Sequence, residues 1–261
     1  MNWMGLAGWG AVAVCSVMLV FWLIHFPIRN AAIVDFGWGF NIGLLGIGYA
    51  AFGGGWVTRA VLIGSMAGVW GLRLAFYLLF DRIIGHPEEG RYQELRRKWK
   101  TNVELKFLAF YQFQAVLCVL MATPFLLSSL NPTPRIHWLE WLGMGLWLIG
   151  ICGEALADAQ LAAFKKDRSN RGRTCQVGLW HYSRHPNYFF EWLIWVAFAT
   201  FANASPNGWI GWLSPVLILY FLLRVTGIPA TEEQALRSRG DEYRKYQQTT
   251  SAFVPWFPKT S

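Results

Sequence analysis

The chain has 261 residues, of which 54% are hydrophobic and 15% charged, a composition too apolar for an ordinary soluble domain. Its formal net charge of +8 would suit a nucleic-acid partner, but basic loops of a membrane protein explain it more simply, so we expect none. The four cysteines are scattered without a CxxC pair, which argues against both a disulfide framework and a zinc site.

The apolar residues gather in blocks of roughly 18 to 25, the length that crosses a hydrocarbon core about 30 Å thick. The first block lacks a basic region before it and reaches His25 without a small-residue cleavage site, so we expect a retained helix rather than a signal peptide. The predicted spans are 4–26, 32–53, 57–80, 107–129, 138–163, 186–204 and 208–226. We therefore expect an all-α integral membrane protein, a seven-helix transmembrane bundle forming a single domain over residues 1–261.

Basic residues separate the two ends of this bundle. With seven spans, one set of connections holds Arg29, the cluster in 82–106, the run in 165–184 and the C-terminal tail, whereas the opposite set holds only Arg59 and Arg135. The positive-inside rule then places the C-terminus in the cytoplasm, and we expect a multi-pass protein of a bacterial inner membrane. Polar segments 87–104 and 229–247 predict cytoplasmic amphipathic helices, the second with a proline start and Thr231 as N-cap.

Several ionisable residues fall inside the apolar spans, where each would cost on the order of 2.5–3.5 kcal/mol near the bilayer centre and is therefore a functional candidate. They are Asp35, Arg73, Glu154, Asp158 and Glu191. Asp35 lies near a helix start and could be an interfacial cap, with Arg73 as a structural partner. Glu154 and Asp158 share one helical face, where a ligand, or a salt bridge to Arg173 or Arg184, would relieve their repulsion.

Segment 179–192, LWHYSRHPNYFFEW, carries the most specific local pattern. Pro186 predicts the start of a helix whose free N–H groups, with Arg184 and His185 beside them, suit a phosphate. Asn187 and Glu191 are four apart, so their amide and carboxylate share a face and could bind a carboxamide or a ribose hydroxyl. The alternative is that this stretch merely begins a helix and that the basic run before it is a solvated loop.

Other site chemistries lack a motif. No G-x-G-x-x-G follows a strand and there is no Walker-type loop, so a nucleotide would bind without a Rossmann fold. The five histidines are not at ligand spacing with acids or cysteines, so we expect no metal site. No nucleophile-elbow motif supports a hydrolase.

The sequence GLWHYSRHPNYFFEW resembles the C-terminal signature of the steroid 5α-reductases and their bacterial relatives. The resemblance extends to IVDFGWG (33–39), WGLRLAFYLLFDR (70–82), GRYQELR (90–96) and the tail from 232 onwards. It implies a membrane reductase with NADPH as cofactor and a Δ4-3-ketosteroid or similar lipid enone as substrate. Residues 1–106 would then form the substrate side and 107–261 the NADPH-binding part.

The same resemblance implies site residues by position. Asn187, Tyr188 and Glu191 would contact the cofactor together with Asp158. Phosphate-side or adenine-side partners would be Lys165, Arg173, Arg184, His185, Arg224 and Arg91. Asp35 and Tyr77 would be catalytic, because a hydrogen bond from Tyr77 or from a protonated Asp35 would stabilise the enolate oxygen after hydride reaches the β-carbon.

Two other functions stay open at this stage. An S-adenosylmethionine-dependent membrane methyltransferase of the isoprenylcysteine or phospholipid type would share the RHP-x-Y start, without needing Asn187 and Glu191 as a nicotinamide clamp. A transporter or lipid-binding membrane protein would use the buried charges to line a pathway, although no inverted repeat is evident. The sequence indicates the lipid bilayer as a partner and no particular protein partner.

Overall fold

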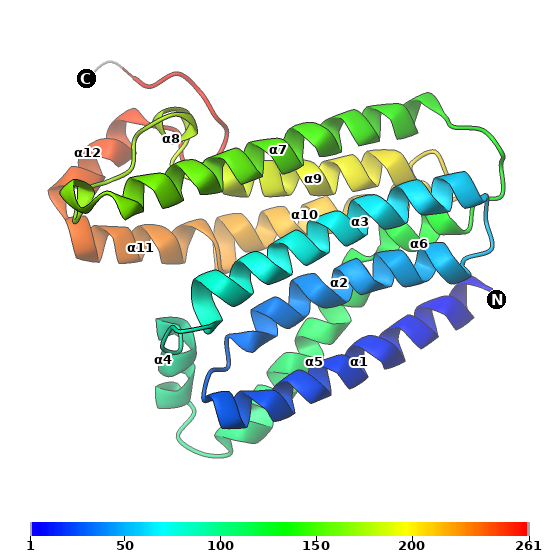
Figure 1. Ribbon diagram of the computed structural model, residues 1–261, viewed down its shortest axis with the longest axis horizontal. Coiled ribbons are helices and arrows are strands. Elements are labelled where there is room, and N and C mark those ends of the chain that lie inside the picture. The colour runs from blue at the N-terminus through cyan, green and yellow to red at the C-terminus, as the bar shows by residue number, and fades with distance from the viewer. Residues whose placement is uncertain (1, 260–261) are drawn as a thin grey trace. The chain divides into compact units, whose positions relative to one another are not determined.

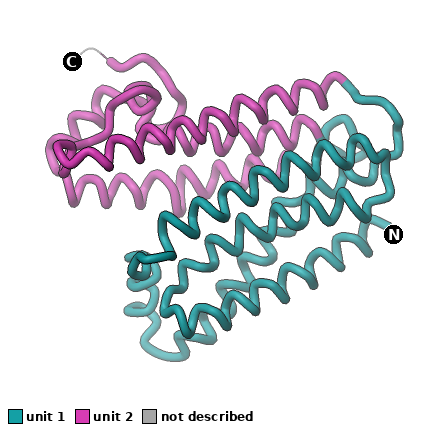
Figure 2. The backbone as a smooth tube through the Cα atoms, in the orientation of Figure 1, with its two compact units in different colours: residues 1–137, 202–211 teal, residues 138–201, 212–261 magenta. Residues whose placement is uncertain are grey.

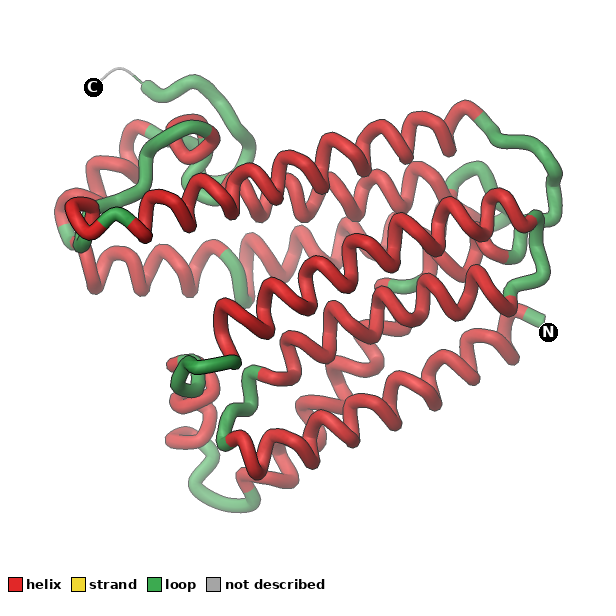
Figure 3. Tube along the Cα trace, viewed as in Figure 1, coloured by secondary structure: helices red, strands yellow, loops and turns green. Residues whose placement is uncertain are grey.

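The computed structural model describes residues 2–259, and every regular element in that part of the chain is helical (Figure 3). The chain forms two compact units (Figure 2), the first comprising Met1–His137 with Ala202–Gly211 and the second Trp138–Phe201 with Trp212–Ser261. The description as a single domain, with a functional division at 106/107, stays a prediction.

Unit 1 contains six α-helices (Figure 1): α1 (Trp3–Ile28), α2 (Ile33–Phe52), α3 (Val57–Leu78), α4 (Gly90–Lys98), α5 (Val103–Met121) and α6 (Thr123–Ser129). A π-helical turn, Leu79–Ile83, continues α3. Unit 2 is built from α7 (Trp138–Lys166), α8 (Leu179–Tyr182), α9 (Pro186–Ala202), α10 (Leu213–Tyr220), α11 (Ile228–Arg239) and α12 (Asp241–Thr249). A second π-helical turn, Phe221–Val225, follows α10, and 3₁₀ turns lie at Arg168–Asn170 and Gly208–Trp212.

Five helical segments of the described chain are long and apolar enough to cross a membrane, as an integral membrane protein requires. They are Trp3–Ile28, Val57–Ile83, Val103–Met121, Trp138–Lys166 and Gly208–Arg239. The helices α2 and α9 occupy the positions of the other two predicted spans. The total of seven spans and the cytoplasmic orientation stay predictions.

The two polar segments are helical over less of their length than expected. In 87–104 a helix covers Gly90–Lys98, and the last two residues already belong to α5, because the chain turns away after Trp99 and Asn102 adopts a left-handed φ of 51°. Segment 229–247 is broken into α11 and α12 at Gly240, whose φ of 56° suits a residue without a side chain.

The N-cap assignment of Thr231 is wrong. Helix α11 begins at Ile228, directly after Gly227, and Pro229 lies in its first turn. Thr231 is therefore inside the helix, and its hydroxyl donates a 2.9 Å hydrogen bond to the carbonyl of Gly227 four residues earlier.

Small residues bring α2 and α3 of unit 1 close together (Figure 1). A Cβ added to Gly71 would lie 2.7 Å from the Cα of Gly43, and one added to Gly46 would lie 2.3 Å from the Cβ of Ala67. Such close backbone approach is the usual basis of helix association in membranes, where burial of apolar surface between helices gains little. The pair α2–α3 therefore forms the tightest contact of unit 1.

In unit 2, the C-terminal segment packs against the stretch that precedes α9. The hydroxyl of Ser183 donates to the carbonyl of Phe253 at 2.8 Å, and the amide of Arg184 donates to the carbonyl of Ser251 at 2.8 Å. The amide of Trp256 donates to Tyr182 at 2.9 Å. These bonds fix the approach to α9, which carries most of the candidate site.

Candidate active site

Helix α9 begins at Pro186, as the sequence predicts. Its N-terminal approach is rigid: Ser183 is extended, with φ −144° and ψ 144°, and its hydroxyl accepts a 3.1 Å hydrogen bond from the amide of His185. Proline at the first helical position fixes φ and removes an N–H that the helix could not satisfy. Asn187 and Glu191 consequently occupy the first two turns of α9.

The amide of Asn187 connects α9 to α7. Its Nδ2 donates to Oδ1 of Asp158 at 3.3 Å, and its Oδ1 accepts from the backbone N–H of Tyr188 at 3.1 Å. Asp158 and Asn187 are 29 positions apart in the sequence, and both are half-buried. Two residues predicted to contact the cofactor are thus in direct contact with each other.

Glu191 lies one turn further along α9 and is 8% exposed. Its Oε1 accepts a 2.9 Å hydrogen bond from the indole Nε1 of Trp195. The bond fixes the direction of the carboxylate, because Trp195 is fully buried. With Asp158 and Asn187, this residue gives unit 2 one amide and two carboxylates near the start of α9.

Arg184 and His185, both predicted phosphate partners, contact a carboxylate of α11. Arg184 Nε lies 2.7 Å from Glu232 Oε1, and His185 Nε2 lies 3.3 Å from the same oxygen. Nη1 of Arg184 also donates to the carbonyls of Gln247, at 3.0 Å, and Thr250. The two side chains therefore hold α11 and the C-terminal segment, and their role toward phosphate stays a prediction.

The remaining predicted cofactor residues of unit 2 differ in exposure. Tyr188 stacks on His185, with ring centroids 5.3 Å apart and planes at 6°, and its hydroxyl lies 3.2 Å from that of Thr231. Lys165, Arg173 and Arg224 are exposed, and none of the three side chains forms an ion pair with another described residue. These three cations can bind an anion without breaking an existing contact.

Arg91, the remaining predicted cofactor residue, lies in unit 1 and pairs with Asp35, a predicted catalytic residue. The guanidinium of Arg91 and the hydroxyl of Tyr92 donate to the two oxygens of Asp35, the latter at 2.8 Å. Burial opposes the charge of Arg91, but Asp35, Tyr92 and Glu89 together outweigh burial and raise the pKa of Arg91. Burial, together with Asp35, also raises the pKa of Tyr92, so Tyr92 is a neutral hydrogen-bond donor.

Tyr77 lies near the end of α3 and is 37% exposed. Phe36, which follows Asp35, contacts Phe76, which precedes Tyr77. The centroids of the two rings are 6.4 Å apart, and the ring planes meet at 66°. The start of α2 therefore packs beside the end of α3 within unit 1. This packing places Asp35 and Tyr77 on adjacent helix ends.

Sequence reasoning did not single out Tyr92 or Glu232. Tyr92 follows Arg91 in the segment GRYQELR, so the signal that the sequence offers is an aromatic residue within a polar segment. The structure shows that this tyrosine is only 1% exposed. Glu232 lies within the polar segment 229–247, for which only an amphipathic helix is predicted. Nothing local marks its pairing with Arg184, 48 positions away.

Fold and site together define an all-helical protein with membrane-length apolar helices and a cluster of amide and carboxylate groups at the start of α9. The chain belongs to the family described as "Protein of unknown function (DUF1295)", whose model matches residues 21–250. It is 26% identical over 271 aligned residues, 90% of this chain and 76% of the relative, to the uncharacterized protein C594.04c of Schizosaccharomyces pombe. No solved structure matches the chain.

Proposed function

We propose that this protein is an NADPH-dependent reductase of the C=C bond of a lipid enone, with a Δ4-3-ketosteroid as the leading substrate class. The observation that carries the proposal is the hydrogen bond between Asn187 and Asp158, with the Glu191 carboxylate one turn away. Asn187 and Glu191 lie in the segment that resembles the C-terminal signature of the steroid 5α-reductases, and the resemblance adds Asp158 from α7. The family match spans all three residues.

The residues of unit 2 fit a dinucleotide by their chemistry. An amide and two carboxylates can bind the carboxamide and ribose hydroxyl groups, while exposed Lys165, Arg173 and Arg224 can bind phosphates. The aromatic face of Tyr188 adds a surface for stacking. The unpaired state of the three cations favours a ligand with several negative charges, as NADPH has.

NADPH supplies a hydride when bound, and the protein must then stabilise the negative charge that develops on the ketone oxygen. We propose Tyr77 as the hydrogen-bond donor to that oxygen. Its phenol lies in the last turn of α3, in an apolar helix long enough to cross a membrane. A donor placed where charge develops lowers the barrier without changing cofactor affinity.

For Asp35 we propose a positioning role. Both of its oxygens already accept hydrogen bonds, from Arg91 and Tyr92, so its carboxyl group is held within unit 1. Through these bonds it attaches α4 to the start of α2, next to the end of α3 that carries Tyr77. Asp35 therefore acts on the ketone site through α4 and α2.

A membrane location suits such a substrate. The apolar helices allow a sterol-sized molecule to enter laterally from lipid, which a soluble enzyme could not offer. We propose that the start of α9 and the C-terminal segment face the cytoplasm, where NADPH is available, and that the membrane is the bacterial inner membrane.

The test is oxidation of NADPH by the detergent-purified protein with progesterone or testosterone, comparing wild type, Glu191→Gln and Glu233→Gln. Glu191→Gln should abolish turnover and weaken NADPH binding, whereas Glu233→Gln changes an exposed carboxylate and should behave as wild type.

The proposed hydrogen-bond donor is tested in the same assay. Tyr77→Phe should lower kcat by about 10²-fold with unchanged NADPH affinity. Tyr220→Phe, which changes an exposed tyrosine of α10, should leave kcat unchanged.

Three outcomes separate the alternatives. NADPH binding without turnover would support NADPH as the cofactor and would show that the steroid is not the substrate. The absence of NADPH binding, with binding of S-adenosylmethionine, would replace the reductase by a methyltransferase. Equal turnover in wild type and Glu191→Gln would show that the start of α9 does not hold the cofactor.

A further inference from the structure

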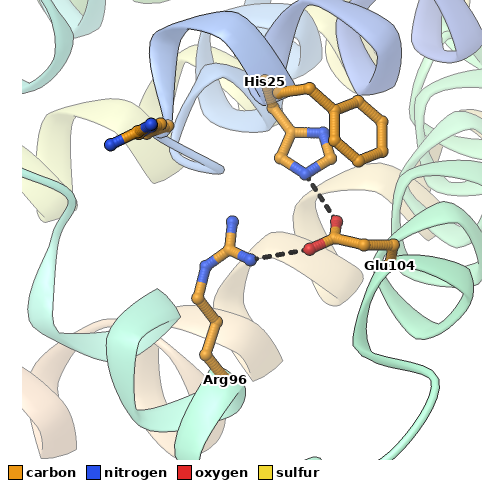
Figure 4. A pocket seen from close by; sticks show the side chains of 5 residues that line it. His25, Arg96 and Glu104 are labelled. Carbon is orange, nitrogen blue, oxygen red and sulfur yellow. Dashed lines mark hydrogen bonds and ion pairs between the residues drawn. The ribbon is translucent and has the colours of Figure 1, made fainter.

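A pocket at the end of α1 contains none of the residues assigned above to the cofactor or the substrate. It has a volume of about 290 Å³ and is lined by His25, Phe26, Arg29, Arg96 and Glu104, all in unit 1 (Figure 4). Its walls come from the last turn of α1, from α4 and from the first turn of α5. Four of its five side chains are ionisable, which is unusual beside an apolar span.

An ordered charge network forms the floor of this pocket. Nε2 of His25 lies 2.8 Å from one oxygen of Glu104, and Nη1 of Arg96 lies 3.0 Å from the other (Figure 4). Nε of Arg96 also lies 3.0 Å from Glu88, whose other oxygen accepts a 2.8 Å bond from the amide of Ala31. Both oxygens of the Glu104 carboxylate are thus in contact with a nitrogen, one of them from the Arg96 guanidinium, which reduces the repulsion of an anion.

His25 is held between two oxygen atoms in this network. Both ring nitrogens face oxygen acceptors, Nδ1 the carbonyl of Trp22 and Nε2 the carboxylate of Glu104. The guanidinium groups of Arg29 and Arg96 equal in number the carboxylates of Glu88 and Glu104.

Arg29 is the cation of this pocket that holds no partner. It ends α1 in a left-handed conformation with φ 51°, and its exposed side chain forms no ion pair or hydrogen bond with another described residue. Arg96, in contrast, is used by Glu88 and Glu104. An entering anion would therefore meet Arg29 as the guanidinium of this pocket that no described carboxylate holds.

The surroundings identify the kind of anion. Only 17% of the most apolar 18-residue stretch of α1 is buried within the protein, so most of this stretch is open to lipid. Beside the pocket, Leu23, Ile28 and Leu105 are 53%, 42% and 63% exposed. A ligand with a negative headgroup at the basic end of the helix and apolar chains along α1 matches both features.

We propose that the pocket lined by His25, Phe26, Arg29, Arg96 and Glu104 binds the phosphate of an anionic membrane phospholipid, with Arg29 as its main contact. The same side chains could also bind a free phosphate. The two ligands differ because only the phospholipid has acyl chains, which add to its binding. Charge-assisted hydrogen bonds to phosphate are short and strong, and a half-enclosed site strengthens them further.

The experiment measures bound lipid by native mass spectrometry of the full chain, released from mixed phosphatidylglycerol and phosphatidylcholine micelles. Wild type should retain phosphatidylglycerol preferentially. Arg29→Gln should reduce that retention about tenfold, whereas Arg97→Gln, which removes an exposed charge of α4 outside the pocket, should leave it unchanged. Arg29→Lys keeps the charge and should restore retention to within about threefold of wild type.

Each outcome decides the proposal. Equal losses in Arg29→Gln and Arg97→Gln, or no preference for phosphatidylglycerol, would overturn it, because the attraction would then be general surface charge. If excess inorganic phosphate displaces the lipid, the pocket binds phosphate but the lipid is not its specific ligand. Retention that survives excess phosphate would support the phospholipid. A thermal midpoint equal to wild type in each variant confirms that the fold is intact.

Discussion

Nδ2 of Asn187 and Oδ1 of Asp158 lie 3.3 Å apart, which joins the first turn of α9 to α7 within unit 2. Because the Asn187 carbonyl is also held by the amide of Tyr188, the side chain has one orientation. Both residues are only half-buried, so each retains surface for a ligand. The pair is therefore organised before any cofactor arrives.

A double-mutant cycle tests whether this pair acts as one unit. Asp158→Ala and Asn187→Ala should each weaken NADPH binding, and the double variant should lose little more than either single one, with a coupling of about 1 kcal/mol. Titration of NADPH by fluorescence measures the four affinities. Asp241→Ala, which alters an exposed carboxylate, is the control. Strictly additive losses would mean that the two residues bind independently.

Arg184 should matter for stability more than for cofactor affinity. Its side chain is 9% exposed, and it binds Glu232 together with two backbone carbonyls of the C-terminal segment. Removing one member of a buried pair costs about 3–5 kcal/mol, so Arg184→Gln should lower the Tm markedly and speed hydrogen exchange in residues 247–253. Exposed Arg237 pairs with Glu233, and Arg237→Gln should change stability by less than about 0.5 kcal/mol. Similar Tm values for the two variants would refute the structural role.

Helix positions could be predicted closely from the sequence, because a long apolar block bounded by prolines or charges has one stable conformation in lipid. The predicted 4–26 is Trp3–Ile28, and the predicted 32–53 is Ile33–Phe52. The break of the predicted 107–129 at Ala122 was not foreseen, since no local breaker other than Pro124 marks it.

Side-chain pairing could not be predicted in the same way. The sequence identified Asp35 and Arg91 separately, but their ion pair joins positions 56 apart and depends on how α4 folds back. His25 was considered only as a metal ligand, because no acid stands near it in the sequence. Its carboxylate partner, Glu104, lies 79 positions away. Local patterns report periodicity and caps, whereas such contacts follow from the packing of whole helices.

Gly71 should tolerate no side chain. A Cβ there would lie 2.7 Å from both the Gly39 carbonyl oxygen and the Gly43 Cα, which are backbone atoms that cannot move alone. Gly71→Ala should therefore destabilise the protein by about 1–3 kcal/mol. Gly48 lies on α2 with open space around the same position, so Gly48→Ala should be neutral or stabilising by up to about 1 kcal/mol. Thermal unfolding in detergent compares the two, and an equal response would contradict the close α2–α3 packing.

Tyr243 should make the protein less stable at alkaline pH. Burial, assisted by the Glu232 carboxylate, raises the pKa of Tyr243 to about 12 from its ordinary 10. In the unfolded chain the phenol ionises near pH 10, so between about pH 10 and 12 the folded state holds a proton that the unfolded state has lost. Stability should accordingly be unaffected by Tyr243 below about pH 10 and then fall by up to about 1.4 kcal/mol per pH unit.

Tyr243→Phe removes this ionisation and should make the alkaline decline shallower. Chemical unfolding of both proteins from about pH 8 to 11.5, followed by near-ultraviolet circular dichroism, measures the difference, and unfolding below about pH 9 is the internal reference. The two curves should run parallel up to about pH 10 and diverge above it, because only the wild type must lose a proton there on unfolding. Curves that stay parallel to the highest pH would show that Tyr243 is solvated in the folded protein and that α12 does not bury it.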